Sequence, residues 1–316
     1  QIKDPGSMVV GKDGLPLYGK HVVLTGGTNG LGLGLLHESV RLGAAKVSLL
    51  CRSLELGEKC KEQVRALGPA EVCLVHVDLS SMAAVQRAAA AIEGKVDVLF
   101  LNAGLMGGGT ATLTEEGLET TFAVNVASVH LLARLLVPAL AKGARMIVTG
   151  SDAGDAVKWK VDHSAMQGEE GMGPGGFLQY ARSKVLAHQQ AGALGDMLDG
   201  AGIDASVCAF HPGAVSSQMG HNIAPLLAFF MKPILALCLR SPRTAAAIGI
   251  LAATADPPLR RGYLSDGNLG TPRESVFALP KPISGAADAQ ECERSFAAVE
   301  ALVCKALQVA SLPPVV

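Results

Sequence analysis

A phenol and an ammonium group stand four residues apart in the sequence Tyr180-Ala181-Arg182-Ser183-Lys184. Residues at this spacing share one face of a helix, so the two side chains would lie together. A free tyrosine has a pKa of about 10, and a fixed cation nearby favours the phenolate and lowers that pKa. The pair can then act as a general acid–base catalyst. The same spacing is common on solvated helix faces, so catalysis requires further residues that fit it.

A glycine-rich turn follows the first apolar run in the sequence HVVLTGGTNGLGLG. Residues 21–24 have the pattern of a buried parallel strand, and residues 31–42 have helix periodicity. Gly26, Gly30 and Gly32 permit a tight turn and a close approach of the backbone to a ligand. The helix N-terminus would meet phosphate groups with unpaired N–H groups and its positive dipole end. The predicted pyrophosphate site comprises Gly26, Thr28, Asn29, Gly30, Leu31 and Gly32.

The second apolar run, 47–50, is followed by Cys51-Arg52-Ser53. A site that prefers NAD places an acidic residue here to bond the ribose 2′-hydroxyl, and this chain has none at these positions. Arg52 offers a planar, permanently charged group that suits a 2′-phosphate. We therefore expect NADP(H) as the cofactor. The alternative is that Arg52 is a solvated cation at the end of a strand.

Polar residues also follow the third and fourth predicted strands, as Asp78-Leu79 and as Asn102-Ala103-Gly104. In a parallel sheet, ligands lie beyond the carboxyl ends of the strands, so these groups can reach the edge of an adenine ring. Each of them can equally be a strand terminus or a helix cap.

Two further candidates follow later strands. Ser151 comes after the apolar stretch 146–149, and Pro212-Gly213 comes after a sixth predicted strand. Pro212 lacks an N–H and Gly213 relaxes the backbone, which is consistent with a tight turn against a flat ligand.

In this order, the motifs resemble those of the short-chain dehydrogenase/reductase family of the classical type. They are Thr25-Gly26-x-x-x-Gly30-x-Gly32, Asp78, Asn102-Ala103-Gly104, Ser151, Tyr180-x-x-x-Lys184 and Pro212-Gly213. The resemblance extends from about Tyr18 to the strand expected at 261–265. The Cys51-Arg52-Ser53 strand end, the long interval between Ser151 and Tyr180, and the stretch SPRTAAAIGILAATAD look similar to the branch of retinol dehydrogenases and protochlorophyllide reductases.

The resemblance implies a catalytic tetrad of Asn125, Ser151, Tyr180 and Lys184. In it Ser151 polarises the substrate carbonyl, Tyr180 donates the proton, and Lys184 lowers the pKa of Tyr180 and holds the ribose. Asn125 would keep a water that links Lys184 to solvent, or would only make a buried hydrogen bond. The resemblance also assigns Asp78, Leu79, Asn102, Ala103 and Gly104 to the adenine side and Pro212, Gly213 and Val215 to the nicotinamide, with Tyr180 and Lys184 contacting the cofactor as well.

The expected function is that of an NADPH-dependent carbonyl reductase, reversible as an alcohol dehydrogenase, acting on an apolar aldehyde, ketone or quinone. One alternative is reduction of a carbon–carbon double bond with the same tyrosine and lysine. Another is a non-catalytic NADPH-binding sensor or scaffold, because a fold does not fix a function.

The elements that must position these residues alternate along the chain, which predicts an α/β doubly wound parallel sheet, Rossmann-like, of about seven strands with helices on both faces. Strands are expected at 21–25, 46–51, 71–77, 97–101, 144–150, 203–210 and 261–265. Helices are expected at 30–42, 54–67, 81–93, 115–141, 177–199, 241–254 and 288–308.

Composition and charge narrow the functional classes. The chain has 316 residues, and we expect residues 9–316 to form one domain, because no Pro/Gly/Ser-rich linker divides them. The segment 1–8 looks like an expression-vector remnant followed by the start Met8. A formal net charge of −1 without a basic block argues against nucleic acid as a partner.

The seven scattered cysteines fit a reducing, cytoplasmic compartment better than a disulfide framework. No metal site is expected, because the pairs Cys73-x-x-His76 and Cys208-x-x-His211 lie on predicted strands, where residues three apart point to opposite faces.

Two segments carry open alternatives. The glycine-rich loop 152–176 is either a mobile substrate flap or a disordered surface insertion. The apolar stretch 223–239, within a region of about 215–240, is interpreted as a lid over an apolar substrate, with membrane-surface association or a subunit contact as competing uses. The family resemblance also suggests a homodimer through the helices around 115–141 and 177–199.

Overall fold

The computed structural model describes residues 14–154, 161–213, 241–256, 258–260, 263–265, 279–281 and 289–315. Within these residues eight strands form one sheet in the order β3-β2-β1-β4-β5-β6-β7-β8. The strands are β1 (His21–Thr25), β2 (Lys46–Cys51), β3 (Glu71–His76), β4 (Val96–Leu101), β5 (Leu140–Thr149), β6 (Ala205–Phe210), β7 (Tyr263–Ser265) and β8 (Leu279–Lys281). The first seven pair in parallel, and β8 runs antiparallel to β7. The predicted doubly wound parallel sheet is confirmed, with β8 as an unpredicted addition.

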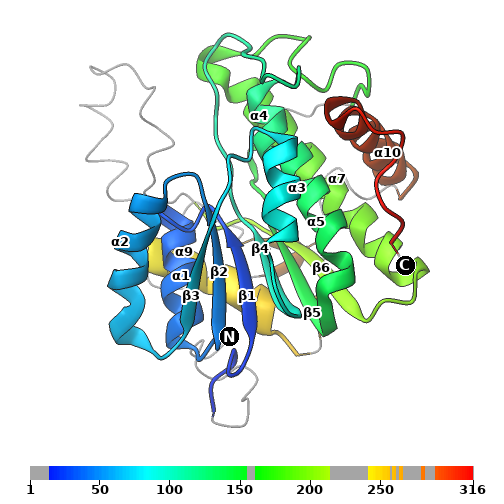
Figure 1. Ribbon diagram of the computed structural model, residues 1–316. Coiled ribbons are helices and arrows are strands. Elements are labelled where there is room, and N and C mark those ends of the chain that lie inside the picture. The colour runs from blue at the N-terminus through cyan, green and yellow to red at the C-terminus, as the bar shows by residue number, and fades with distance from the viewer. Residues whose placement is uncertain are drawn as a thin grey trace.

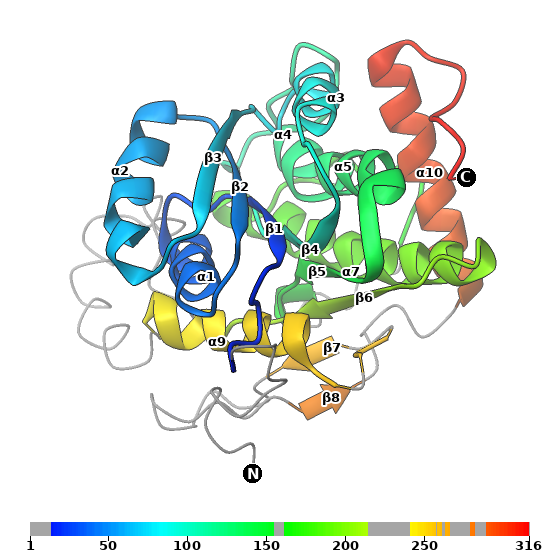
Figure 2. The same cartoon turned by 60° about the horizontal axis from the view of Figure 1, so that its bottom comes forward.

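Helices cover both faces of the sheet (Figures 1 and 2). One face carries α1 (Gly30–Arg41), α2 (Leu54–Val64) and α9 (Pro242–Thr254). The other carries α3 (Met82–Ala90), α4 (Thr120–Phe122), α5 (Ser128–Leu136) and α7 (Phe177–Gly200), with α10 (Ala289–Leu307) outside them. Each face has its own apolar core, so the sheet is buried on both sides, as a parallel sheet requires.

Local sequence explains where the helices begin. The side chains of Asn29, Ser53 and Ser81 accept hydrogen bonds from backbone N–H groups in the first turns of α1, α2 and α3. The carboxylate of Glu116 accepts the N–H groups of Met82 and Ala83 as well, which places a negative charge at the N-terminus of α3. Polar residues at strand ends therefore fix the helix starts.

The long helix predicted at 115–141 is shorter and less regular than expected. Helical structure begins at Thr120, because Gly117 has a positive φ of 78° and the carboxylate of Glu119 caps the first turn. It passes through a π-helical turn (Ala123–Ala127), α5 and a 3-10 turn (Val137–Ala139). Residues 140 and 141 already belong to β5, so the strand predicted at 144–150 also starts earlier than expected.

Other predicted bounds differ by smaller amounts. The helix expected at 81–93 ends at Ala90, ahead of a turn in which Gly94 has a φ of 82°. The strand expected at 203–210 is shorter and covers Ala205–Phe210. Of the strand expected at 261–265, the structure describes Tyr263–Ser265, all of it in β7. Each predicted strand and helix has a counterpart among the described elements.

The described part of the loop before α7 is packed against the fold. Met166 and Met172 are buried, Gln179 donates to the carbonyl of Met166 at 3.1 Å, and Arg182 donates to that of Gly171 at 2.8 Å. Residues 161–173 are therefore held by specific contacts, unlike a disordered insertion. Residues 155–160 lie outside the described residues.

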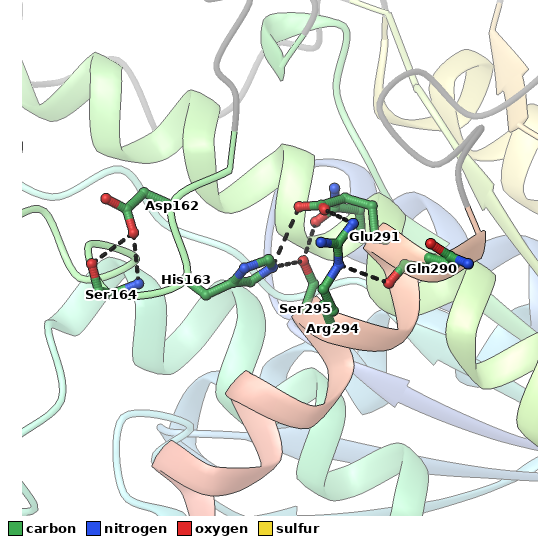
Figure 3. Close-up of polar contacts among 8 residues, drawn as sticks. Asp162, His163, Ser164, Gln290, Glu291, Arg294 and Ser295 are labelled. Atoms are coloured by element: carbon green, nitrogen blue, oxygen red, sulfur yellow. Dashed lines mark hydrogen bonds and ion pairs between the residues drawn. The ribbon is translucent and has the colours of Figure 1, made fainter.

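The same loop is tied to the C-terminal helix (Figure 3). His163 Nε2 lies 3.0 Å from Ser295 Oγ and 3.4 Å from the carboxylate of Glu291, both on α10. Ser295 in turn donates to Gln189 of α7 at 2.6 Å. The loop, α10 and α7 are therefore joined by one line of polar contacts.

Helix α10 also affects the expected subunit contact. It packs on α7, α5 and α3, so part of the surface that the family resemblance assigned to a homodimer is buried within the chain itself. Among the described residues, one stretch is long and apolar enough to cross a membrane, Thr120–Ala139, and 78% of its most apolar window is buried inside the fold. The segment 223–239 and Val215 lie outside the described residues, so their predicted roles stay predictions.

Candidate active site

The predicted site residues gather at one edge of the sheet. Because the strands are parallel, their carboxyl ends meet there, and the order β2-β1-β4-β5 places a topological switch point between β1 and β4. Crossovers leave this point in opposite directions, which opens space for a ligand. Helix α1 starts at the same edge, directly after the turn that follows β1.

Tyr180 and Lys184 lie on one face of the first turns of α7, as their spacing predicts. The Nζ atom of Lys184 is 5.7 Å from the centroid of the Tyr180 ring. It donates a hydrogen bond of 2.9 Å to the carbonyl of Thr149 at the end of β5. This bond fixes the buried ammonium between α7 and the sheet.

The protonation of Tyr180 differs from the prediction. Burial raises the pKa of the Tyr180 phenol above its ordinary value, and the hydrogen bond with the Ser151 side chain opposes this only in part. Lys184 makes its hydrogen bond to Thr149, not to the phenol oxygen, and the expected lowering of the Tyr180 pKa is absent. In this structure Tyr180 is a neutral phenol near neutral pH.

Lys184 is also perturbed by burial. Its side chain is 4% exposed, and burial lowers the pKa of Lys184 from 10.5 to about 8. With this pKa, the buried ammonium beside Tyr180 is mostly charged at neutral pH. It can stabilise negative charge that develops on the phenol oxygen.

Asn125 holds the segment that carries Gly104. It lies in the π-helical turn Ala123–Ala127, and such turns are frequent at functional sites. Its Oδ1 accepts the N–H of Leu105, and its Nδ2 donates to the carbonyl of Leu105 and to Ser183 Oγ, at 2.8, 2.8 and 2.9 Å. A Cβ added at Gly104 would lie 3.3 Å from Asn125 Oδ1 and 3.4 Å from Lys184 Nζ. Asn125 Oδ1 and Lys184 Nζ therefore both lie close to Gly104, and the Asn125 side chain makes hydrogen bonds to Leu105 and Ser183.

Replacing Asn125 with alanine is expected to lower the free energy of unfolding by about 2 to 4 kcal/mol, because it leaves both polar groups of Leu105 without this partner. Ser128→Ala is the matched control, since the buried hydroxyl of Ser128 donates a hydrogen bond to the carbonyl of Val124. Urea denaturation of both variants gives the comparison. Equal losses in the two variants would show that the Asn125 bonds contribute no special stability.

The glycine turn after β1 has the close packing that the pattern predicts. A Cβ at Gly26 would lie 2.9 Å from the Cα of Ala103, and one at Gly32 would overlap the carbonyl oxygen of Gly26. Gly26 and Gly30 have φ values of 68° and 50°, in the left-handed region. The first turn of α1, described in full, contains no acidic residue, so the helix N-terminus offers its positive end.

Asn102 has a different local role from the one expected. Its side chain donates to the carbonyl of Thr25 at 2.9 Å and accepts from Thr149 Oγ1 at 3.3 Å, while its N–H donates to Thr25 Oγ1 at 2.9 Å. These contacts join the ends of β1, β4 and β5. The Asn102 side chain thus connects three strand ends. Ala103 and Gly104 continue the backbone past the glycine turn that follows β1.

Arg52 and Asp78 stand at the ends of β2 and β3. Burial disfavours the charge on Asp78, but hydrogen bonds from the hydroxyl and N–H of Ser80, together with nearby Arg52, outweigh it and hold the pKa of Asp78 below its ordinary value. Arg52 itself is exposed. It is a charged side chain open to an incoming phosphate and close to a carboxylate.

Of the remaining predicted residues, Leu79 is partly buried beside the core, and Pro212 and Gly213 follow β6 at the same edge. Thr28 accepts a bond from the thiol of Cys60, and Asn29 caps Gly30 at 2.7 Å. The structure thus brings all of the predicted cofactor residues except Val215, which is not described, to the carboxyl edge. No group of three or more His, Cys, Asp or Glu side chains in the described ranges can hold a metal ion.

The sequence did not reveal three polar residues that contact Ser151 or its neighbour Asp152. His188 of α7 accepts the N–H of Ser151 through Nε2 at 3.4 Å, and Tyr263 of β7 donates to Asp152 at 2.6 Å. His211, before Pro212, lies 3.8 Å from Asp152. A signal for one of them exists in the sequence, because Tyr180, Lys184 and His188 recur every four residues along α7.

Comparison with known proteins identifies the family. The short chain dehydrogenase family model matches residues 20–226. The chain is 30% identical over 264 residues to the proposed daunorubicin C-13 ketoreductase DnrU of Streptomyces sp. (strain C5), covering 81% of this chain and 85% of the relative. It is 30% identical over 243 residues to retinol dehydrogenase 14 of Mus musculus, covering 71% and 67%.

Solved structures agree on the fold. An uncharacterized protein from Mycobacterium paratuberculosis superposes with a TM-score of 0.71 at 24% identity, covering 97% of this chain and 100% of that one. A short chain dehydrogenase from Burkholderia cenocepacia J2315 in complex with NADP gives a TM-score of 0.63 at 22% identity, covering 81% and 100%. The chain therefore belongs to the short-chain dehydrogenase/reductase family of oxidoreductases, as its motifs indicate.

Proposed function

We propose that the protein is an NADPH-dependent carbonyl reductase, reversible as an alcohol dehydrogenase, for an apolar aldehyde, ketone or quinone. The observation that carries the proposal is the set of groups around Tyr180. Its buried phenol is hydrogen-bonded to the Ser151 side chain, and its ring centroid lies 5.7 Å from the buried ammonium of Lys184, which can stabilise the phenolate that proton transfer leaves. Reduction of a carbonyl requires such a donor at the carbonyl oxygen.

The residues divide the reaction between them. NADPH, when bound, supplies the hydride that reduces the carbonyl carbon. Ser151 donates a hydrogen bond to the carbonyl oxygen, and Tyr180 transfers its hydroxyl proton to that oxygen, giving an alcohol and leaving a phenolate. The ammonium of Lys184 stabilises this phenolate until a proton from solvent replaces the one transferred.

The positions of Ser151 and Lys184 make this division consistent. Ser151 Oγ accepts the N–H of Ala153 at 3.2 Å, so its hydroxyl hydrogen stays available to the phenol or to a substrate oxygen. Lys184 is fixed to Thr149 and does not compete for the phenol oxygen. Asn125 holds the backbone at Leu105, next to Gly104, and so maintains the wall beside Lys184.

The residues at the strand ends suit NADPH. The first turn of α1 lacks acidic side chains, and exposed Arg52 can pair with a 2′-phosphate in a bidentate way. Asp78 lies near enough to Arg52 to help orient the guanidinium. A relative in the same fold was solved with NADP, which supports the proposal by analogy.

Changing Arg52 to aspartate is expected to weaken NADPH binding by about 10- to 100-fold. The charge-assisted pair between Arg52 and the 2′-phosphate is lost, and the negative aspartate repels that phosphate. Affinity for NADH should rise, since a carboxylate can accept the ribose 2′-hydroxyl. Lys59→Asp is the control, because it makes the same charge change on exposed α2, where Lys59 pairs with Glu55. Titration of nicotinamide fluorescence measures all three proteins. Equal NADPH affinities in R52D and K59D would place Arg52 outside the cofactor site.

The apolar substrate class is supported by the relatives, which include retinol dehydrogenases 12 and 14 and the proposed ketoreductase. The assay uses NADPH or NADH with a panel of apolar aldehydes, ketones and quinones and follows the loss of reduced nicotinamide absorbance. NADPH oxidation with formation of the alcohol supports the proposal. A product saturated at a carbon–carbon bond, or NADPH binding with no turnover on any substrate, would contradict it.

A further inference from the structure

His188 is a buried histidine that the proposed reaction leaves without a role. It lies on α7 one turn after Lys184 and is 1% exposed. Its Nε2 atom is 3.4 Å from the N–H of Ser151, the first residue after β5. A buried histidine that reaches the backbone of the substrate-orienting serine has a functional position.

The donor on the Ser151 side fixes the protonation of the ring. A backbone N–H can only donate, so Nε2 must be the unprotonated nitrogen that accepts. In neutral imidazole the proton is then on Nδ1, and an imidazolium would have no acceptor to offer. The contact therefore requires one tautomer of His188.

The surroundings hold the ring in this place. A Cβ at Gly150 would overlap His188 Nε2, so a glycine is needed for the ring to reach β5. On another side the ring packs against Tyr263, with centroids 4.6 Å apart and planes at 57°. Tyr263 donates to the Asp152 carboxylate at 2.6 Å, so the residue after Ser151 is fixed by the same group.

Ser151 is held through both its backbone N–H and its side-chain hydroxyl. The backbone N–H is held by His188, and the hydroxyl meets Tyr180 and the N–H of Ala153. Movement of the Ser151 backbone by a few tenths of an ångström would shift its hydroxyl relative to the phenol. Misplacement of a reacting group by 1 Å can lower a rate by about 100-fold.

We propose that His188, as the Nδ1–H tautomer, is the positioning residue for Ser151 and thereby sets the geometry in which the serine hydroxyl meets the substrate oxygen and Tyr180. The inference rests on the proposed carbonyl reductase function for its consequence in catalysis. The hydrogen bond and the tautomer do not depend on that function. The spacing Tyr180, Lys184, His188 then places a proton donor, a cation and a support for Ser151 on one helix face.

The catalytic test compares His188→Leu with His188→Gln. Leucine fills similar space without an acceptor, and the glutamine carbonyl can replace Nε2. We expect H188L to lower kcat by about 10- to 100-fold, with the dissociation constant of NADPH within about twofold of wild type. H188Q should recover at least half of the lost activity on a logarithmic scale. A merely structural role would give equal losses in both variants.

A matched control separates packing from positioning. His130 of α5 is also fully buried, but its ring nitrogens lie 2.8 Å from Gln190 Oε1 on α7 and 3.3 Å from the carboxylate of Glu300 on α10. His130→Leu is expected to lower the melting temperature while leaving kcat within about twofold. If H130L lost as much kcat as H188L at equal loss of stability, the proposal would be overturned.

A second measurement does not need turnover. Histidine labelled with ¹⁵N in the ring reports by NMR which nitrogen carries the proton, and H188Q assigns the signal. We expect Nε2 of His188 to be unprotonated and Nδ1 protonated, with a shifted Ser151 amide in H188L. A protonated Nε2 overturns the proposal whether or not any carbonyl is reduced. The expected tautomer in a protein that reduces no carbonyl would leave the contact correct and reject only the reductase function.

Discussion

Tyr180→Phe is expected to lower kcat for carbonyl reduction by about 10²- to 10⁴-fold, the usual contribution of a general acid. The variant keeps the ring that lies 5.7 Å from Lys184 Nζ and loses only the hydroxyl that bonds Ser151. NADPH affinity should stay within about twofold. Steady-state kinetics with an active substrate from the panel, together with fluorescence titration, measures both quantities.

The protonation of Tyr180 can be checked separately by spectroscopy. Because burial raises the pKa of this phenol, the wild-type protein should show no titration of Tyr180 near neutral pH, and ultraviolet difference spectra can check this. Tyr18→Phe is the control variant, since Tyr18 is 48% exposed before β1. A Y180F enzyme that retained more than a tenth of wild-type kcat would refute Tyr180 as the proton donor.

Lys184→Met is expected to lower kcat by about 10²- to 10³-fold, because it removes the charge that stabilises the phenolate. The wild-type rate should also decline as the pH rises through about 8, where buried Lys184 loses its proton. The methionine variant has no such group, so its residual rate should change little across this pH. Rates measured from pH 6.5 to 9.5 provide the comparison.

The same pKa predicts a stability effect with a definite sign. The folded-state pKa of Lys184 is lowered from 10.5 to about 8, so between these values the unfolded chain binds the proton and the folded chain does not. Stability contributed by this residue therefore rises with pH in that window, by about 3 kcal/mol in total for a shift of this size. Below pH 8 both states are protonated and the contribution is constant at its lowest value.

Denaturation of wild type and K184M at several pH values tests this directly. The difference in unfolding free energy should move in favour of wild type from pH 8 to pH 10.5, while groups common to both proteins cancel. A constant difference across the window would mean that Lys184 is not desolvated in the folded protein. A difference that moved in favour of K184M as the pH rises would mean that a partner stabilises the charged form of Lys184 in the folded protein.

Much of the fold follows from local pattern. The runs at β1, β2 and β4 are short and apolar because both faces of the sheet are covered, and their alternation with helices predicts parallel crossovers. The turn at Gly26 is predictable because positive φ and close packing against Ala103 exclude larger residues. These signals lie within a few residues of the structure they specify.

Other features depend on contacts between distant segments. The phenol pKa of Tyr180 is set by burial, and the spacing to Lys184 alone suggested the opposite direction. The side chain of Asn102 bonds strand ends that come from three places in the sequence. The π-helical turn at Asn125 and the antiparallel β8 have no clear local pattern either.

The residues that hold Ser151 in place also could not be predicted from local sequence. His188, Tyr263 and Asp152 come from α7, β7 and the loop after β5, and only their packing brings them together. The four-residue recurrence along α7 marks His188 as a member of the catalytic face. It does not reveal which backbone group the ring meets.

The most direct test follows the hydride with an isotope and the proton donor with a variant. The wild-type protein is incubated with NADPH that carries deuterium at nicotinamide C4, prepared in both configurations, and with an apolar ketone from the panel. We expect deuterium on the carbinol carbon from one configuration only, and loss of the product in Y180F. Deuterium on a carbon of a reduced double bond, or none in any product, would contradict the proposal that this site reduces carbonyl groups.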